Sequence, residues 1–206
     1  SDTFEDCYYQ GIYGVQSAIG VGVTFTKVNK DAITKAITYA WSGDMFSSRI
    51  WKNKDRLIDA LKQELTVGLV QGRSTQEMSR NLRDKMGTSY FNANRIIRTE
   101  ANYVMNEGTA QGYKASGFVK KYEFLATLDD RTSKKCGSLD GKVYNLEDKQ
   151  VGVNCPPLHP FCRSSIMPSF PKDADAQRIA RDADGQTYYV PASMTYEEWK
   201  AKNNIK

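Results

Sequence analysis

Two cysteines and the only histidine of the chain lie close together in one proline-rich stretch, NCPPLHPFCRSS, at residues 154–165. Their spacing is Cys155-x3-His159-x2-Cys162, and a third thiol, Cys136, lies 19 residues before the first of them. Thiolates and imidazole at short spacing are the usual ligands of tetrahedral zinc. The four residues therefore predict a Cys3His zinc site of the closed, structural kind, because a catalytic zinc site keeps one position open.

Three other interpretations of the same residues remain open. Free cysteines are often small buried apolar side chains, and a single histidine can simply hydrogen-bond a loop carbonyl. Cys136 and Cys162 could form a disulfide, which needs an oxidising compartment. Cys162 or Cys155 could be a nucleophile that His159 activates, as in a thiol hydrolase. Three neighbouring thiols nevertheless suit a metal better than they suit one nucleophile.

The prolines of this stretch determine its backbone. Proline fixes φ and removes an amide donor, so Pro156, Pro157 and Pro160 exclude a regular helix or a central strand. The segment must be a loop, and the elements before it must position its side chains. A small loop-rich module with few apolar residues needs an additional cross-link to be stable, and a structural metal would provide one.

The chain before residue 118 predicts an extended start followed by helices. Residues 1–30 are rich in Gly, Tyr and β-branched residues, and GVGVTFTKV alternates as in a short strand or extended arm. From Asp31 the apolar residues recur at helical spacing, so 31–117 is predicted to be a helical region. Ser74 and Glu77 form a capping box inside it. The helices are expected at residues 31–41, 58–72, 74–86 and 89–117.

The chain after Gly117 predicts a small α+β module at 118–170. FVKKYEFLATL is typical of a strand, with alternate residues of Tyr122–Ala126 on one face. Asp140-Gly141 is a strong hairpin signal, and SSIMPSF predicts a second short strand. The fold class is therefore α+β: a helical N-terminal part followed by a loop-rich module stapled by zinc.

The last segment, 171–206, is expected to be a C-terminal tail. Its first part, ADAQRIARDADG, predicts a weak, exposed helix. Thr195 and Glu198 form a second capping box, which predicts a short terminal helix.

Composition limits the class of protein. The 206 residues are 40% hydrophobic and 11% aromatic, enough for the core of one large domain or two small ones. No run of 18 apolar residues exists, so no membrane span is expected. The first residues are acidic and do not form a secretory signal, and four cysteines without such a signal favour a reducing compartment. Cys7 has no assigned role. The missing initiator Met is expected of a processed, tagged or partial chain.

The net charge of +5 permits a contact with nucleic acid. Basic and acidic residues are mixed along the chain, however, and no Lys/Arg block resembles a basic arm. A solvated, mixed surface is favoured over a dedicated DNA groove. Two charged stretches also have structural interpretations: Arg98-Thr99-Glu100 as a helical surface turn and Asp129-Asp130-Arg131 as a turn at a strand end.

Three long stretches in fixed order carry a family resemblance: RIIRTEANYVMNEGTAQGYKASG, YEFLATLDDRTSKKCGSLDGKVY and GVNCPPLHPFCRSSIMP. They resemble the phage head morphogenesis family, also called minor head or minor capsid proteins. This family includes protein F of phage Mu and its relatives in phages of Gram-positive bacteria. WSGDMFSSRIWKN is similar to the Gram-positive branch, so the likeness covers roughly residues 20–168.

The resemblance implies a structural protein of the virion or procapsid interior, present in the host cytoplasm during assembly. Its expected partners are the phage portal or other head proteins, with weak, non-specific contact to phage DNA during packaging or ejection. Some relatives carry fused toxin domains, which implies that the module itself is a delivery or attachment unit. We therefore expect no enzyme activity, and the alternative is a zinc- or thiol-dependent hydrolase (nuclease or peptidase) or an effector-type module.

The resemblance also bears on the ligands. The family pattern supports Cys136, His159 and Cys162, and it commonly has a different residue where this chain has Cys155. The fourth ligand is therefore open among Cys155, an acid such as Asp140, and water.

Overall fold

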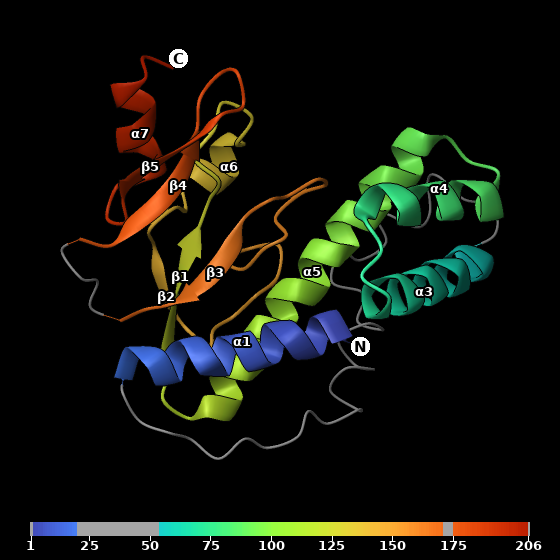
Figure 1. Cartoon of the computed structure of the whole chain (residues 1–206), viewed down its shortest axis with the longest axis horizontal. Coiled ribbons are helices and arrows are strands. Elements are labelled where there is room, and N and C mark those ends of the chain that lie inside the picture. The colour runs from blue at the N-terminus through green and yellow to red at the C-terminus, as the bar shows by residue number, and fades with distance from the viewer. Residues whose placement is uncertain (1, 20–53, 171–174, 206) are drawn as a thin grey trace.

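The computed structural model describes residues 2–19, 54–170 and 175–205, and Figure 1 shows their arrangement. Helices combine with two small antiparallel sheets, which confirms the α+β class. The helix predicted at 31–41 and the strand predicted in GVGVTFTKV fall on residues outside those ranges. The elements, in chain order, are α1 (Asp2–Ile19), α3 (Lys54–Val70), α4 (Thr75–Met86), α5 (Tyr90–Ser116), β1 (Lys121–Leu125), α6 (Lys134–Gly137), β2 (Val143–Asn145), β3 (Ser165–Pro168), β4 (Gln177–Arg181), β5 (Thr187–Pro191) and α7 (Tyr196–Lys202).

Helix α5 is the central element of the fold. Its 27 residues span about 40 Å, and it contacts α1, α3, α4 and β3 (Figure 1). The predicted limits are confirmed, because the Ser89 side chain accepts a hydrogen bond from Asn92 N and Gly117 ends the helix with φ +73°. One helix thus joins the helical part to the three-stranded sheet, beside which Cys136, Cys155 and Cys162 lie.

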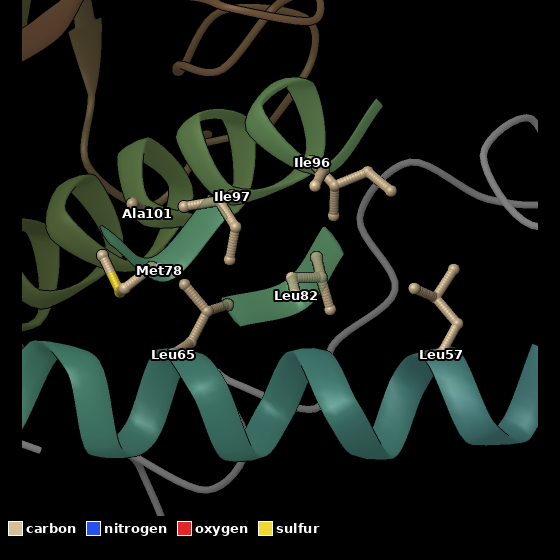
Figure 2. Packing of buried hydrophobic residues seen from close by; sticks show 8 residues of the cluster. Leu57, Leu65, Met78, Leu82, Ile96, Ile97 and Ala101 are labelled. Carbon is tan, nitrogen blue, oxygen red and sulfur yellow. The ribbon is translucent and has the colours of Figure 1, made fainter. Parts of the chain in front are cut away.

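The N-terminal half of α5 packs with α3 and α4 around one apolar cluster (Figure 2). Leu82 and Ile97 are fully buried at its centre, and Leu65 of α3 faces them. The helix predicted to end near Gly72 and the Ser74 cap of the next helix are both confirmed. Spacing and capping therefore predicted this part correctly.

A buried carboxylate ties α3 to α4. Glu64 is 2% exposed and accepts hydrogen bonds from Asn81 Nδ2 at 2.8 Å, Arg73 Nη1 at 3.2 Å and Lys85 Nζ at 3.3 Å. Each partner compensates part of the cost of removing this charge from water.

The extended arm predicted at residues 1–30 is wrong for Asp2–Ile19, which form helix α1. Tyr8 and Ile12, one helical turn apart, are buried in its packing against α5. The two helices approach very closely: a Cβ on Gly112 would lie 2.3 Å from the Tyr8 carbonyl oxygen. Packing on α5 overrides the weak helix propensity of the glycines and β-branched residues.

The three-stranded sheet has the order β2-β1-β3 with antiparallel pairs. Tyr122 pairs with Tyr144 of β2, and Phe124 pairs with Ile166 of β3. Both predicted strands, at β1 and β3, are confirmed. Asp140-Gly141 is not a two-residue hairpin, because β1 and β2 are joined by a longer segment that contains α6. Gly141, with φ +77°, instead donates its N–H to the Phe124 carbonyl.

The C-terminal segment is a packed unit rather than an exposed tail. The weak helix predicted in ADAQRIARDADG is wrong at β4, which pairs with β5 and matches Ile179 to Tyr189. The second capping box is confirmed at α7. Its Trp199, 1% exposed, lies in an apolar cluster with Leu128, so this unit packs on the segment that follows β1. The domain boundaries 1–30, 31–117, 118–170 and 171–206 stay a proposal.

Candidate metal centre

The structure brings together three of the four predicted ligands. The ligand atoms of Cys136, His159 and Cys162 all lie within 4.8 Å of one another. Cys136 comes from α6, whose first turn is capped by the Ser133 hydroxyl. His159 and Cys162 come from the proline-rich loop that leads into β3. Both thiols are buried in an apolar cluster with Phe124 and Leu158, and the imidazole is half-buried.

The distances among these atoms are close to those of a tetrahedral site. The two Sγ atoms lie 3.7 Å apart, and Cys136 Sγ lies 3.1 Å from His159 Nε2. Two thiolates that share one zinc at about 2.3 Å each are separated by about 3.8 Å. A small outward shift of the imidazole would bring the distance between His159 Nε2 and Cys136 Sγ to the value expected for two ligands of one zinc. Both thiols are free, so the alternative disulfide is not formed.

The contacts of the histidine favour the tautomer that can bind a metal through Nε2. Its Nδ1 lies 2.8 Å from the Pro160 carbonyl oxygen, which can only accept a hydrogen bond. In the neutral ring Nδ1 therefore carries the hydrogen, and Nε2 presents a lone pair. That lone pair points toward Cys136 Sγ and Ser133 Oγ, the latter at 2.8 Å.

The two clustered thiols are electrostatically unequal. The hydrogen bond from Cys136 is the largest influence that lowers the pKa of Cys162, and backbone N–H groups of Leu158 and Ser164 add to it. The same bond, followed by burial, raises the pKa of Cys136. Of the two thiols, Cys162 is therefore the one that loses its proton more readily. This direction favours the deprotonation that metal binding requires.

Cys155, expected as the fourth ligand, lies outside this group. Its side chain is fully buried in another apolar cluster, with Tyr122 and Ile166, and its Sγ lies 3.7 Å from the Pro156 carbonyl oxygen. Burial raises the pKa of Cys155 to about 12, which disfavours the thiolate that binds metals. The separation follows from the loop, because the residues between Cys155 and His159 carry the chain from one cluster to the other.

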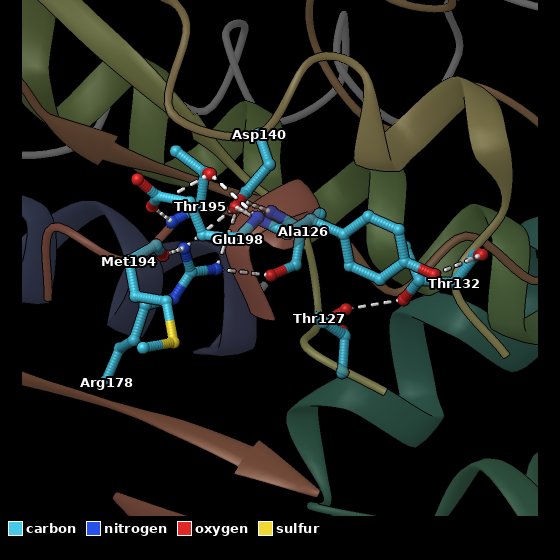
Figure 3. A network of polar contacts seen from close by, with 9 residues as sticks. Ala126, Thr127, Thr132, Asp140, Arg178, Met194, Thr195 and Glu198 are labelled. Carbon is cyan, nitrogen blue, oxygen red and sulfur yellow. Dashed lines mark hydrogen bonds and ion pairs between the residues drawn. The ribbon is translucent and has the colours of Figure 1, made fainter. Parts of the chain in front are cut away.

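Asp140, the other protein candidate, is occupied elsewhere (Figure 3). Its carboxylate is fully buried and accepts hydrogen bonds from Ala126 N and Tyr196 N, both at 2.7 Å. It also forms a bidentate pair with Arg178. Arg178 in turn donates to the Ala126 and Met194 carbonyls. Asp140 therefore joins the end of β1 to the C-terminal unit and has no free lone pair directed at the cysteines.

Helix α5 holds the ligand loop through polar side chains that the sequence interpretation missed. Thr99 Oγ1 accepts from Phe161 N at 3.0 Å, and Asn102 Nδ2 donates to the Ser164 carbonyl at 3.0 Å. Asn106 Nδ2 reaches the same carbonyl at 3.4 Å. These contacts lie on both sides of Cys162. Polar residues at 99, 102 and 106 share one face of a mostly buried helix, which is the signal that could have identified them.

An ion pair fixes the other side of the loop. Asp129, 2% exposed, is bound by both terminal nitrogens of Arg163, with Nη2 to Oδ1 at 2.7 Å. Burial acts to raise the pKa of Asp129, but the bonds from Arg163 outweigh it, so the pKa is lowered. The predicted turn at Asp129 therefore also anchors the residue that follows Cys162.

Comparison with known proteins places this module in a family. A family model described as "Phage Mu protein F like protein" matches residues 59–167, slightly more than half of the chain. The chain belongs to the phage Mu protein F-like family. The matched range contains the three clustered residues of this Mu F-like chain and the α5 side chains that hold their loop. The β4–β5–α7 unit follows it.

Two curated proteins are similar to this Mu F-like chain. The minor head protein GP7 of Bacillus phage SPP1 is 24% identical, over 96% of this chain and 68% of that protein. A protein of Enterococcus faecalis strain V583, named NAD(+)--arginine ADP-ribosyltransferase EFV, is 29% identical over 148 residues. That alignment covers 70% of this chain but only 30% of the Enterococcus protein. No solved structure matches the chain. Among the described residues no helix is long and apolar enough to cross a membrane.

Proposed function

We propose that this Mu F-like protein is a minor head protein that acts in phage head morphogenesis by docking to the portal or the inner capsid. The observation that carries the proposal is the likeness to a phage minor head protein over 96% of the chain. The fold supports a binding role, because its buried charged and polar side chains mainly connect helices, strands and loops to one another. Its location would be the virion or procapsid interior, and the host cytoplasm during assembly.

Within this role, Cys136, His159 and Cys162 bind one structural zinc. The supporting features are the 3.7 Å separation of the thiols, the Nδ1 contact that leaves the lone pair on His159 Nε2, and the lowered pKa of Cys162. Bound zinc would cross-link α6 to the proline-rich loop, and thus fix two segments that no regular element joins. The protein would dock as a rigid module.

A zinc- or thiol-dependent hydrolase is the alternative, with Cys162 or Cys155 as its candidate nucleophile. The hydrogen bond with Cys136 lowers the pKa of Cys162, which lies in one cluster with His159, whereas burial raises the pKa of Cys155 to about 12. However, Cys162 is 3% exposed and Cys155 is fully buried. A nucleophilic cysteine needs a thiolate that a substrate can reach. The transferase activity named for the Enterococcus relative belongs to a protein of which this chain covers under a third.

Contact with phage DNA is a secondary part of the proposal. The net charge of +5 would allow a weak, non-specific contact, whose affinity falls steeply as salt rises.

The test is incorporation into heads. In cells producing phage heads, the wild-type chain should co-purify with the portal protein, and His159→Ala should reduce its amount in purified heads. Cys155→Ser is the matched control, since it changes a buried cysteine outside the metal group. The proposal fails if purified protein cleaves nucleic acid or peptide with turnover, and His159→Ala abolishes cleavage while head incorporation stays intact.

A further inference from the structure

The three clustered ligands would fill three of the four positions of a tetrahedral metal. Among the residues that the structure describes, no fourth Cys, His, Asp or Glu joins the group. Asp140 and Asp129, the buried acids nearest to α6 in the chain, are both bound to arginines. Cys155 faces a different cluster. A site with three protein ligands is the arrangement that admits a ligand from outside.

Ser133 lies where such a ligand would be held. Its Oγ is 2.8 Å from His159 Nε2 and accepts a hydrogen bond from Cys136 N at 3.2 Å. Because Nε2 presents a lone pair, the Ser133 hydroxyl hydrogen is donated to it. A metal on Nε2 takes that lone pair. The hydroxyl hydrogen is then available to a new acceptor beside the metal.

The space at this point fits one oxygen atom. A small pocket of about 20 Å³ is lined by Ser133, Cys136 and His159, with Arg131 and Ser164 also at its wall. About 10–15 Å³ is the least that holds one water. The pocket therefore admits a water molecule, or a single oxygen of a larger ligand that enters from solvent.

A basic side chain at the pocket wall can offset the charge of an anionic ligand. Zinc with two thiolates is neutral, so an added anionic oxygen leaves the site with one negative charge. The Arg131 side chain is 68% exposed at the pocket wall, and its contact to Asp129 is long, at 3.8 Å. Its guanidinium can turn toward a bound anion without breaking a tight ion pair.

We propose that the metal site keeps an open fourth position, which takes an exchangeable oxygen ligand: water, or one oxygen of a carboxylate or phosphate. Ser133 is the positioning residue that donates to this ligand, and Arg131 balances its charge. The inference rests on the proposed metal site, and it names the class of external ligand that this site would bind.

The test uses the full chain loaded with Co²⁺, whose visible spectrum reports the donor atoms. Titration with acetate and, separately, with inorganic phosphate should shift the cobalt bands saturably, with the metal retained on gel filtration. A response to acetate alone assigns a carboxylate ligand, and a response to phosphate alone assigns a phosphate. Arg131→Gln should weaken anion binding several-fold and leave metal affinity unchanged.

Variants at Ser133 separate positioning from folding. Ser133→Ala should weaken the anion response by roughly tenfold, the scale of lost support around a metal, and Ser133→Thr should restore it. Ser133→Cys should add a sulfur–cobalt charge-transfer band and abolish the response to anions. Cys155→Ser should leave the wild-type spectrum unchanged.

Two results would overturn the inference, and they are distinguishable. Bound cobalt that ignores both anions, with a sulfur signal that falls in Cys155→Ser, shows a closed site with Cys155 as the fourth ligand. Failure of the wild-type chain to bind cobalt or zinc at all removes the proposed metal site itself.

Discussion

Asp140 offers the sharpest test of how the C-terminal unit is attached. Its carboxylate is fully buried and accepts from two backbone N–H groups and from Arg178, which is itself only 9% exposed (Figure 3). Asp140→Ala leaves those donors without an acceptor and the guanidinium as an unpaired buried charge. Breaking a buried pair in this way costs about 3–5 kcal/mol.

That cost is a large share of the stability of a chain of this size. Globular proteins unfold with about 5–15 kcal/mol, and 1 kcal/mol corresponds to about 2–4 °C in Tm for 150–250 residues. We therefore expect Asp140→Ala to lower Tm by about 6–20 °C. Thermal and urea unfolding followed by near-UV circular dichroism would measure the change, with Glu147→Ala, an exposed acid, as the matched control.

A double-mutant cycle separates the pair from its surroundings. Arg178→Met alone should also be strongly destabilising, because it leaves the Asp140 carboxylate with fewer partners. Combined with Asp140→Ala, it should cost less than the sum of the two single changes. If Asp140→Ala lowers the free energy of unfolding by less than about 1 kcal/mol, the carboxylate does not fasten the unit, and the reasoning is refuted.

Three further predictions concern the metal, pH and helix packing. A chelator should raise proteolysis within 118–170 and leave α3–α5 resistant, because metal binding contributes folding free energy only where the ligands lie; uniform unfolding, or no change on protease mapping, would count against this. The pKa of Asp129 is lowered in the folded state, so its contribution to stability is present above the ordinary Asp pKa and is lost as pH falls toward the lowered value. Asp129→Asn should flatten that acid limb in urea titrations, and an unchanged limb would contradict the assignment. Gly112→Ala should destabilise the α1–α5 contact by about 1–3 kcal/mol, because its Cβ meets the Tyr8 carbonyl, whereas Gly14→Ala, with open space around it, should not; equal Tm values would contradict the packing.

The sequence predicted the helices whose ends carry local capping signals. Ser74, Ser89 and Thr195 are side-chain caps, and Gly117 adopts the left-handed conformation that closes α5. These signals are local, so no knowledge of packing was needed. Helix α1 was missed because its stability comes from close packing on a partner about a hundred residues away, at Gly112. Strand β4 was missed because only its pairing with β5 and the burial of Ala180 determine it.

The sequence predicted the three residues that cluster, but it could not predict that Cys155 lies outside the cluster. Ligand types and spacing identified Cys136, His159 and Cys162, which the fold brings together. Spacing also included Cys155, although nearness in sequence does not fix which cluster a loop side chain enters. The supports of the loop, such as Thr99, were taken for surface residues, because the burial of that helix face depends on the loop that it holds.

Native mass spectrometry of the purified full chain tests the central claim most directly. The account predicts one zinc per chain, lost in Cys136→Ser, His159→Ala and Cys162→Ser and retained in Cys155→Ser. A wild-type chain purified without chelator that carries far less than one zinc, and takes up none when zinc is added, would contradict it.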